Sequence, residues 1–299
     1  MHPVHTGVPV QNCPCAGLSQ CSRACVGHGV ALSQHAYIDS ILDCYNLTDL
    51  KPLSTPMDTS IQLSTEQAPT SVVEYVVMHN VPYCEAIGML NWAMLATCLD
   101  IAFAVVTVAR FTVNPSPAHW EAVKQIFCYL AGMCNLWLSY GERKQTLEEY
   151  ADMDGSMAED RAISGFVFLI DGGAVSWSSK CQELVSLSMT KSEYIAVMHS
   201  MKEVLWLCSL LAELFSSLKA PATLFSDNQA AITLTHDHQY HACMKHIDVH
   251  YHFIQQVIEQ GSLCIIYCLT NNMVTDALTK ALPLAKVKHF TAGLGLCMK

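Results

Sequence analysis

The sequence predicts an α/β protein in which a mixed five-stranded sheet with flanking helices follows a smaller, mainly helical region. Up to about residue 140, apolar residues recur at helical spacing, whereas strand-like runs bounded by turn residues dominate beyond it. The second half reads β-β-β-α-β-α-β-α, an order typical of a mixed sheet with helices on its faces. With 299 residues, of which 52% are hydrophobic and 14% charged, the chain can bury a full core. Wholesale disorder and collagen-like or coiled-coil architectures are therefore excluded.

We predict three parts: an unstructured leader over residues 1–33, a mainly helical region over 34–140 and an α/β domain over 141–299. The leader is rich in Gly, Pro, His and Cys and has no sustained periodicity. A polar, charged joint at residues 141–145 separates the other two parts.

Helix signals are clearest at two places in the 34–140 region. After Gln34, four apolar residues share one helical face: Tyr37, Ile41, Leu42 and Tyr45. A later helix has Ser116 as its cap, Pro117 at its first position and Gly132 as its stop. The polar stretch 58–80 predicts a linker.

Residues 86–109 form the most membrane-like stretch, but it contains Asn91 and Asp100. We expect two buried helices broken near Asp100 rather than a membrane span, and no membrane partner. No apolar segment follows a basic start at the N-terminus, so an intracellular protein of the cytoplasm or nucleus, not a secreted one, is expected. The 15 cysteines are expected to be mostly reduced and buried.

The 141–299 region is predicted to begin with three strands, of which the last two form a hairpin around residues 171–173. A long helix, a strand, a short helix, a helix, a strand and a final helix follow. The predicted ranges are, in chain order, 147–152, 163–170, 174–179, 191–215, 223–226, 228–235, 246–260, 263–269 and from about 273.

Four acidic residues lie at strand ends or in first helical turns of this region: Asp152, Glu193, Asp227 and Asp276. Packing of these elements would gather the acids into one cluster, which is stable when cations such as Mg²⁺ or Mn²⁺ neutralise it. Two such ions can activate water and stabilise the leaving oxygen of a phosphodiester, as in a two-metal nuclease. Taken singly, each acid could instead be a helix cap or a charge at the positive end of a helix.

Two groups of segments, spread over about residues 33–295, carry motifs of one known family. The first group is Tyr150 to Asp154, Ser164 to Leu169, Gly173 to Lys180, Ser192 to Tyr194, Asp227 to Gln229, Lys245 to Asp248 and Asp276 to Lys280. The second group is Leu53 to Met57, Asp100 to Ala104, Asn114-Pro115 and His119-Trp120. The first group resembles the ribonuclease H domain of the Pol polyproteins of copia-type retrotransposons, and the second resembles the stretch that joins the reverse transcriptase of these polyproteins to the ribonuclease H.

The resemblance implies a C-terminal fragment of such a polyprotein: a connection-like reverse transcriptase tail over 34–140 and a ribonuclease H-like fold over 141–299. It implies hydrolysis of the RNA strand of RNA–DNA hybrids, with two Mg²⁺ or Mn²⁺ ions held by Asp152, Glu193, Asp227 and Asp276. The implied partners are the hybrid and the rest of the polyprotein where it is present. The paired-aspartate polymerase motif Tyr-x-Asp-Asp is missing, so the chain is not a competent polymerase alone.

Lys245 and His246, at a predicted helix start, are candidates for phosphate contact, and Asn228 beside Asp227 is a third candidate for substrate binding. The spacing of His246 and His250 also suits a helix-borne zinc pair, but no Cys or acid partner lies at a recognised spacing. A zinc reading of Cys13, Cys15, Cys21 and Cys25 fits equally loosely.

Two further features favour surface or core roles over nucleic-acid contact. Trp177 and Trp206 are expected to pack in the core rather than stack on bases. The basic run of Lys280, Lys286 and Lys288 is expected to be a solvated face rather than a contact to the hybrid backbone.

Departures from the family pattern favour a second hypothesis, a decayed and inactive transposon remnant. Lys191 stands where an acid is usual, and Cys98-Leu99 replaces Arg-Pro before Asp100. Residues 147–299 hold ten basic and 16 acidic side chains, which weakens attraction to phosphates. The four retained acids favour the nuclease.

Overall fold

The structure is a computed structural model. It describes residues 21–26, 29–47, 51–141, 147–154, 163–182, 189–215, 222–229, 232–233, 259, 261 and 263–298. For residues 25–26, 153–154, 189–199, 202 and 215 it describes the backbone only. Lys245, His246, most of the predicted helices 228–235 and 246–260, and all of the leader up to residue 20 lie outside the described residues.

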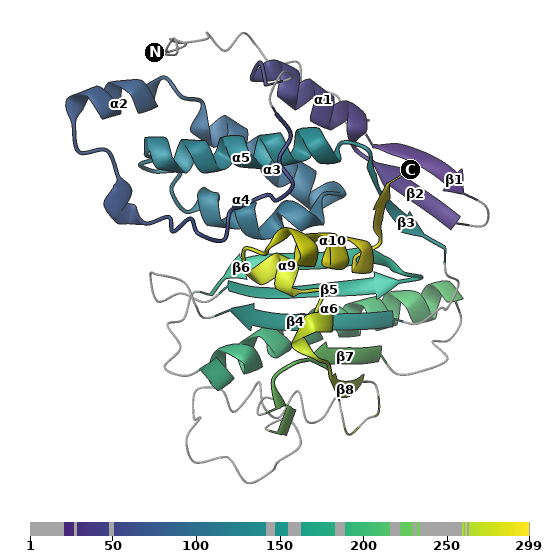
Figure 1. Cartoon of the computed structure of the whole chain (residues 1–299). Coiled ribbons are helices and arrows are strands. Elements are labelled where there is room, and N and C mark those ends of the chain that lie inside the picture. Colours follow the sequence, from purple (N-terminus) through teal and green to yellow (C-terminus); the bar gives the residue numbers. More distant parts are fainter. Residues whose placement is uncertain are drawn as a thin grey trace.

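A five-stranded mixed sheet forms the centre of the second half (Figure 1), as predicted. The order is β6-β5-β4-β7-β8; β5 pairs antiparallel with β4 and β6, whereas β4, β7 and β8 run parallel. The strands are β4 (Leu147–Asp154), β5 (Ile163–Ile170), β6 (Gly173–Cys181), β7 (Ala222–Ser226) and β8 (Leu263–Tyr267). The predicted hairpin is confirmed: Asp171 and Gly172 both have positive φ, the conformation of a tight two-residue turn.

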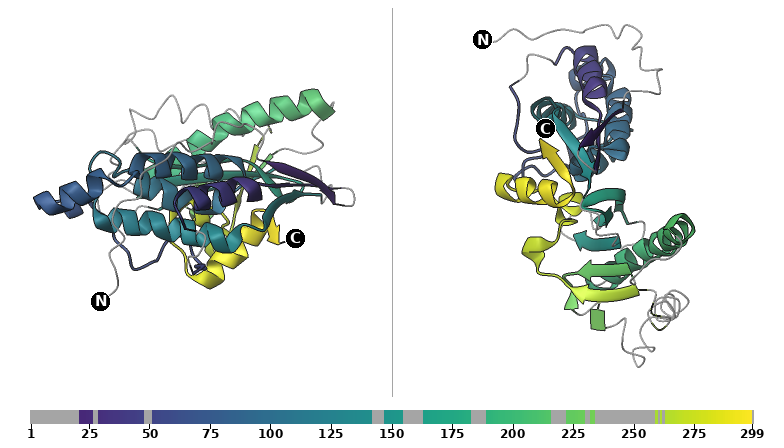
Figure 2. Two further views of the ribbon diagram at one scale, coloured as in Figure 1. Left: turned by 90° about the horizontal axis from the view of Figure 1, so that it is seen from above. Right: turned by 90° about the vertical axis from the view of Figure 1, so that its right-hand side faces the viewer.

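Helices cover both faces of this sheet. The long α6 (Met189–Phe215) packs on one face, and the short α9 (Asp276–Thr279) and α10 (Leu284–Gly293) lie on the other (Figure 2). Alternation along β4 separates the two sides: Leu147 and Ala151 pack with α6, whereas the intervening Tyr150 packs on the side of α9.

The first half contains five helices among the described residues: α1 (His35–Cys44), α2 (Val72–His79), α3 (Tyr83–Ala96), α4 (Ala102–Ala109) and α5 (Pro117–Met133). A 3-10 turn, η2 (Leu99–Ile101), breaks the apolar stretch between α3 and α4, as predicted. In the described part of the chain, no helix combines the length and apolarity needed to cross a membrane.

Capping explains where two of these helices begin. At α5, Ser116 accepts a hydrogen bond from the His119 backbone, and His119 Nδ1 accepts one from the Ser116 backbone, which confirms the predicted start. Ser71 and Glu74 cap α2 in the same reciprocal way. The prediction of a linker over 58–80 is therefore wrong at α2. This capping box starts a helix there, although the segment is rich in valine, which has a low helix propensity.

A second sheet, not predicted, lies beside the helices. Its antiparallel order is β1-β2-β3-β9, built from β1 (Ser22–Val26), β2 (Gly29–Ser33), β3 (Leu136–Tyr140) and β9 (Leu296–Met298). The prediction of an unstructured leader is wrong for residues 22–26 and 29–33. These short strands have weak local signals: β1 pairs with its neighbour β2, and β2 pairs with β3, which is more than 100 residues away in the sequence.

One hydrophobic core joins the two halves. It includes Ile41 and Phe127 from the helices and Leu278 and Phe290 from α9 and α10, while a second core lies under α6. Trp177 packs against the shared core, as predicted, and its indole N–H donates to the Met94 carbonyl over 3.0 Å. Apolar contacts thus cross the predicted boundary at residue 140, and the division itself stays a prediction.

Two expectations about burial are wrong. Trp206 lies on the outer side of α6 with 58% of its surface exposed, because the inner face of that helix is occupied by aliphatic side chains. The ten free cysteines in the described residues are exposed or partly buried rather than fully buried.

A buried hydrogen bond links η2 to α5. The Tyr129 hydroxyl donates to Asp100 Oδ2 over 2.5 Å, and burial raises the pKa of Asp100 above its usual range. We expect Tyr129→Phe to lower the free energy of unfolding by about 1–3 kcal/mol, because the buried carboxyl loses its donor. Urea denaturation of the full chain measures this, and an unchanged midpoint would contradict it.

Candidate active site

Three of the four predicted acids meet at one edge of the five-stranded sheet. Asp152 lies near the end of β4, Asp227 directly follows β7 and Asp276 begins α9. Because β4 and β7 are parallel neighbours, their ends share this edge. Asp152 is 2% exposed and Asp276 fully buried, whereas Asp227 is partly buried. The predicted convergence is thus found for these three acids.

Threonine hydroxyls orient two of the carboxylates. Thr279 Oγ1 donates to Asp152 Oδ2 over 2.8 Å, and Thr270 Oγ1 donates to Asp227 Oδ2 over 2.9 Å. The Ser179 hydroxyl of β6 donates to the Leu278 carbonyl over 2.6 Å, which fastens α9 to the sheet. The acids are therefore held in place by neighbouring elements and not by their own strands alone.

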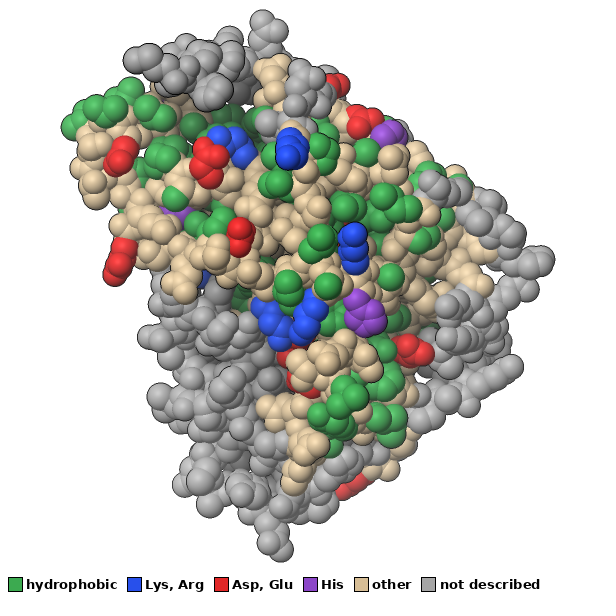
Figure 3. Space-filling model, viewed as in Figure 1, with side chains coloured by type: hydrophobic (Ala, Val, Ile, Leu, Met, Phe, Trp, Pro, Cys, Tyr) green, Lys and Arg blue, Asp and Glu red, His purple; other side chains and the backbone are tan. Residues whose placement is uncertain are grey.

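Lys280 brings a positive charge into this cluster. Its Nζ lies 2.6 Å from Asp276 Oδ1 and 3.7 Å from Asp152 Oδ2. The prediction that Lys280 belongs to a solvated basic face is wrong, because α9 ends at Thr279 and turns the next side chain toward the acids. Figure 3 shows blue basic side chains directly against red acidic ones near the middle of this face.

Burial and mutual repulsion raise the pKa values of two acids. Burial raises the pKa of Asp276 to about 7; the Lys280 ammonium opposes this shift, and the charge of Asp152 adds to it. Burial, followed by the Asp152 charge, also raises the pKa of Asp227. Neighbouring carboxyl groups with raised pKa values are typical of a site that binds a cation.

The remaining predicted residues are only partly placed. The backbone of Glu193 belongs to α6, but its side chain lies outside the described residues, as do Lys245 and His246. Asn228 follows Asp227, and its backbone N–H donates to Ser226 Oγ over 3.3 Å. Their roles in metal or substrate binding stay predictions.

The donor set fits a divalent metal once Lys280 moves. Carboxylate oxygens are the ligands that Mg²⁺ and Mn²⁺ prefer, and Asp276 Oδ2 is buried with no hydrogen-bond partner among the described residues. In the same part of the chain, no three His, Cys, Asp or Glu side chains already surround a common metal position. Lys280 lies between two of the acids instead.

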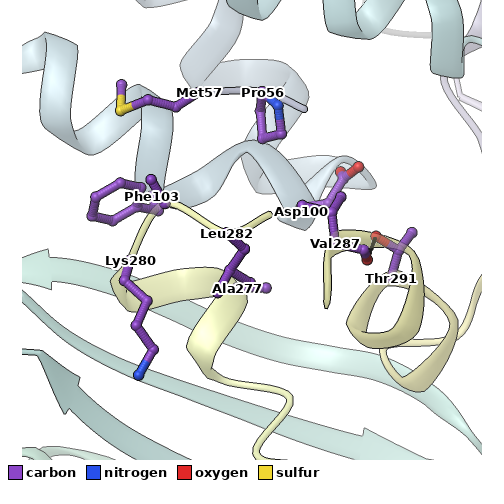
Figure 4. Close-up of a pocket in the computed structure, with 10 residues that line it drawn as sticks. Pro56, Met57, Asp100, Phe103, Ala277, Lys280, Leu282, Val287 and Thr291 are labelled. Atoms are coloured by element: carbon purple, nitrogen blue, oxygen red, sulfur yellow. Dashed lines mark hydrogen bonds between the residues drawn. The ribbon is translucent and has the colours of Figure 1, made fainter. Parts of the chain in front are cut away.

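A hollow adjoins the site on the side of the helical region (Figure 4). Pro56, Met57 and Phe103 line it from the first half, and Lys280 and Leu282 from the second. The stem of Lys280 therefore borders open space while its ammonium reaches the acids.

Sequence reasoning missed Thr270, Thr279 and Lys280 as site residues. The sequence contained a signal for two of them. Thr279 and Lys280 stand three and four residues after Asp276, a spacing that places them on the same side of one helical turn as Asp276. Thr270 has no such signal, since only the fold brings it to Asp227.

Comparison with known proteins identifies the family. No family model matches the chain. It is 42% identical over 254 residues to the retrovirus-related Pol polyprotein from transposon TNT 1-94 of Nicotiana tabacum, and 33% identical over 272 residues to that from transposon RE1 of Arabidopsis thaliana. The chain belongs to the copia-type retrotransposon Pol polyproteins.

These matches cover 84% and 90% of this Pol chain, which spans only 19% and 18% of the two relatives. Among solved structures, the foamy viral protease-reverse transcriptase dRH in complex with double-stranded DNA is similar, with a TM-score of 0.41 and 10% identity. That match covers 70% of this chain and 35% of the viral one.

Proposed function

We propose that this Pol chain hydrolyses the RNA strand of RNA–DNA hybrids with two Mg²⁺ or Mn²⁺ ions. The observation that carries the proposal is the convergence of Asp152, Asp227 and Asp276 at one sheet edge in a member of this family. Glu193 of α6 is proposed as the fourth ligand, and Asn228, Lys245 and His246 as contacts to the hybrid.

The described residues have separable roles in this mechanism. Asp152, Asp227 and Asp276 would hold the metals; Thr279 and Thr270 fix the orientation of Asp152 and Asp227. When bound, the ions supply an activated water and stabilise the leaving oxygen of the phosphodiester. The core shared with the first half fixes α9, and with it Asp276, against the sheet.

One observation favours the alternative of an inactive remnant. Lys280 pairs with Asp276, and the described acids do not surround a common metal position. A cation fixed permanently there would exclude the metals by charge repulsion. Cleavage by the purified protein distinguishes the two functions.

The test is cleavage of an RNA–DNA hybrid, labelled on the RNA strand, by the full chain in Mg²⁺ and in Mn²⁺. We expect RNA-strand cutting that EDTA abolishes. Asp227→Asn should lower the rate at least about 10²-fold, because each ligand supports several kcal/mol of charge stabilisation in the transition state. The matched control Glu213→Gln changes an exposed acid of α6 and should leave the rate unchanged.

Circular dichroism verifies that each variant is folded. A folded wild-type chain that cuts in neither metal would overturn the nuclease proposal and establish the remnant. Equal rates for Asp227→Asn and wild type would show that the cutting arises elsewhere.

A further inference from the structure

Lys280 lies where a cation would neutralise the site. Its ammonium contacts Asp276 Oδ1 at 2.6 Å and lies 3.7 Å from Asp152 Oδ2, next to a Thr279 hydroxyl bound to the same Asp152 oxygen. Asp276 Oδ2, fully buried, keeps no hydrogen-bond partner in the described residues. The single positive charge of Lys280 thus lies between two buried carboxylates, and it leaves Asp276 Oδ2 without a partner among the described residues.

We propose that Lys280 is a built-in cation of this site that a divalent metal displaces. The proposal rests on the proposed two-metal function and adds a role for a residue of this chain. Without metal, the ammonium holds Asp152 and Asp276 together against their repulsion. With metal, the ammonium has to leave Asp276, because a metal ion coordinated there takes the carboxylate oxygen that the ammonium now contacts at 2.6 Å, and an ammonium has no lone pair with which to join the metal's ligands.

The ammonium of Lys280 can move from the carboxylates into solvent. Lys280 is the last residue of its turn and its side chain is 30% exposed, so the charge can reach water. Lys280 also borders the hollow lined by Pro56, Met57 and Phe103 (Figure 4). A flexible lysine stem can follow that apolar border while its ammonium remains hydrated.

Displacement predicts opposite effects of Lys280 on the two states. Removing the charge should weaken the metal-free protein, because two buried acids then face each other without a counter-ion. It should strengthen metal binding, because no ion pair has to be broken first. A lysine that only contacts substrate, or that helps to bind the metal, would not produce this pair of effects.

The experiment measures metal binding and not nuclease activity. Isothermal titration calorimetry of the full chain with Mg²⁺ and with Mn²⁺ compares wild type with Lys280→Met and Lys280→Gln. We expect both variants to bind about tenfold tighter or more, since a charge-assisted pair no longer competes. The control Lys286→Met removes a nearby charge on α10 and should bind as wild type does.

Thermal denaturation supplies the second measurement. Both Lys280 variants should melt below wild type in EDTA, and added metal should raise their Tm by more than it raises that of wild type. Lys280→Gln keeps a polar group and serves if Lys280→Met does not fold without metal.

The outcomes separate the inference from the proposed function. If wild type binds metal and the variants bind with equal or lower affinity, the displacement model is overturned and the two-metal function stands. If neither wild type nor the variants bind metal, the two-metal function itself is overturned.

Discussion

Gly165→Ala is expected to destabilise the chain by about 1–3 kcal/mol, because the added methyl group overpacks the contact with α9. It is also expected to lower the rate of hybrid cleavage about 10²-fold, because a displacement of catalytic groups by about 1 Å is enough to cause a loss of that size. Gly165 lies on β5 directly opposite Asp152. A Cβ at this position would come within 2.8 Å of Thr279 Cγ2 and 3.0 Å of Leu278 Cβ. The added methyl group therefore pushes against the helix that carries Asp276.

A second substitution tests this steric cause. Thr279→Ser removes the Cγ2 atom but keeps the hydroxyl that donates to Asp152, so it should restore part of the stability and rate lost in Gly165→Ala. The control is Gly88→Ala in α3, where an added Cβ meets nothing within 4 Å; there alanine should be neutral or stabilise by up to about 1 kcal/mol. Urea denaturation and hybrid cleavage measure both effects. Wild-type behaviour of Gly165→Ala would refute the close packing of α9 on β5.

Glu149→Gln is expected to stabilise the protein at pH 8 by as much as about 5 kcal/mol, while having little effect near pH 4.5. Glu149 is fully buried on the α6 side of β4, paired across the sheet with Phe168 and Leu224. Burial raises the pKa of this carboxyl to about 8, and the Ser200 hydroxyl opposes the shift only in part. Glutamine has the same shape and no charge to bury.

The direction of the pH effect follows from proton binding. The folded state keeps the Glu149 proton up to about pH 8, whereas the unfolded state releases it near pH 4.5. Because the folded state binds more protons between these values, wild-type stability falls as the pH rises through this window. Glu149→Gln has no titratable group at this position, so its free energy of unfolding does not fall for this reason as the pH rises.

The measurement is guanidinium denaturation of both proteins at pH 4.5, 6 and 8. Glu148→Gln is the matched control, since the neighbouring residue has the opposite orientation on the strand and is partly exposed. A difference between Glu149→Gln and wild type that is the same at every pH would show that ionisation of Glu149 is not its cause.

Local patterns in the sequence determined much of the architecture. The hairpin at Asp171 and Gly172 depends on two residues that tolerate positive φ, and the start of α5 depends on Ser116. The order of strands and helices from β4 to β7 followed from apolar periodicity in the same way, whereas the prediction of one final helix from about residue 273 is wrong, because this segment forms α9, α10 and β9. Asp152, Asp227 and Asp276 were predictable because each lies at the end or the start of such an element.

The tertiary structure alone decided the features that join distant segments. The β1-β2-β3-β9 sheet pairs strands from near both ends of the chain, and the shared core packs the helices against α9 and α10. Thr270 enters the site, Lys280 comes near Asp152, and Glu149 is buried, through contacts with elements remote in sequence. Helix caps and turns are set within a few residues, so the sequence displays them. Strand pairing, burial and the partner of a charge depend on which surfaces meet after folding.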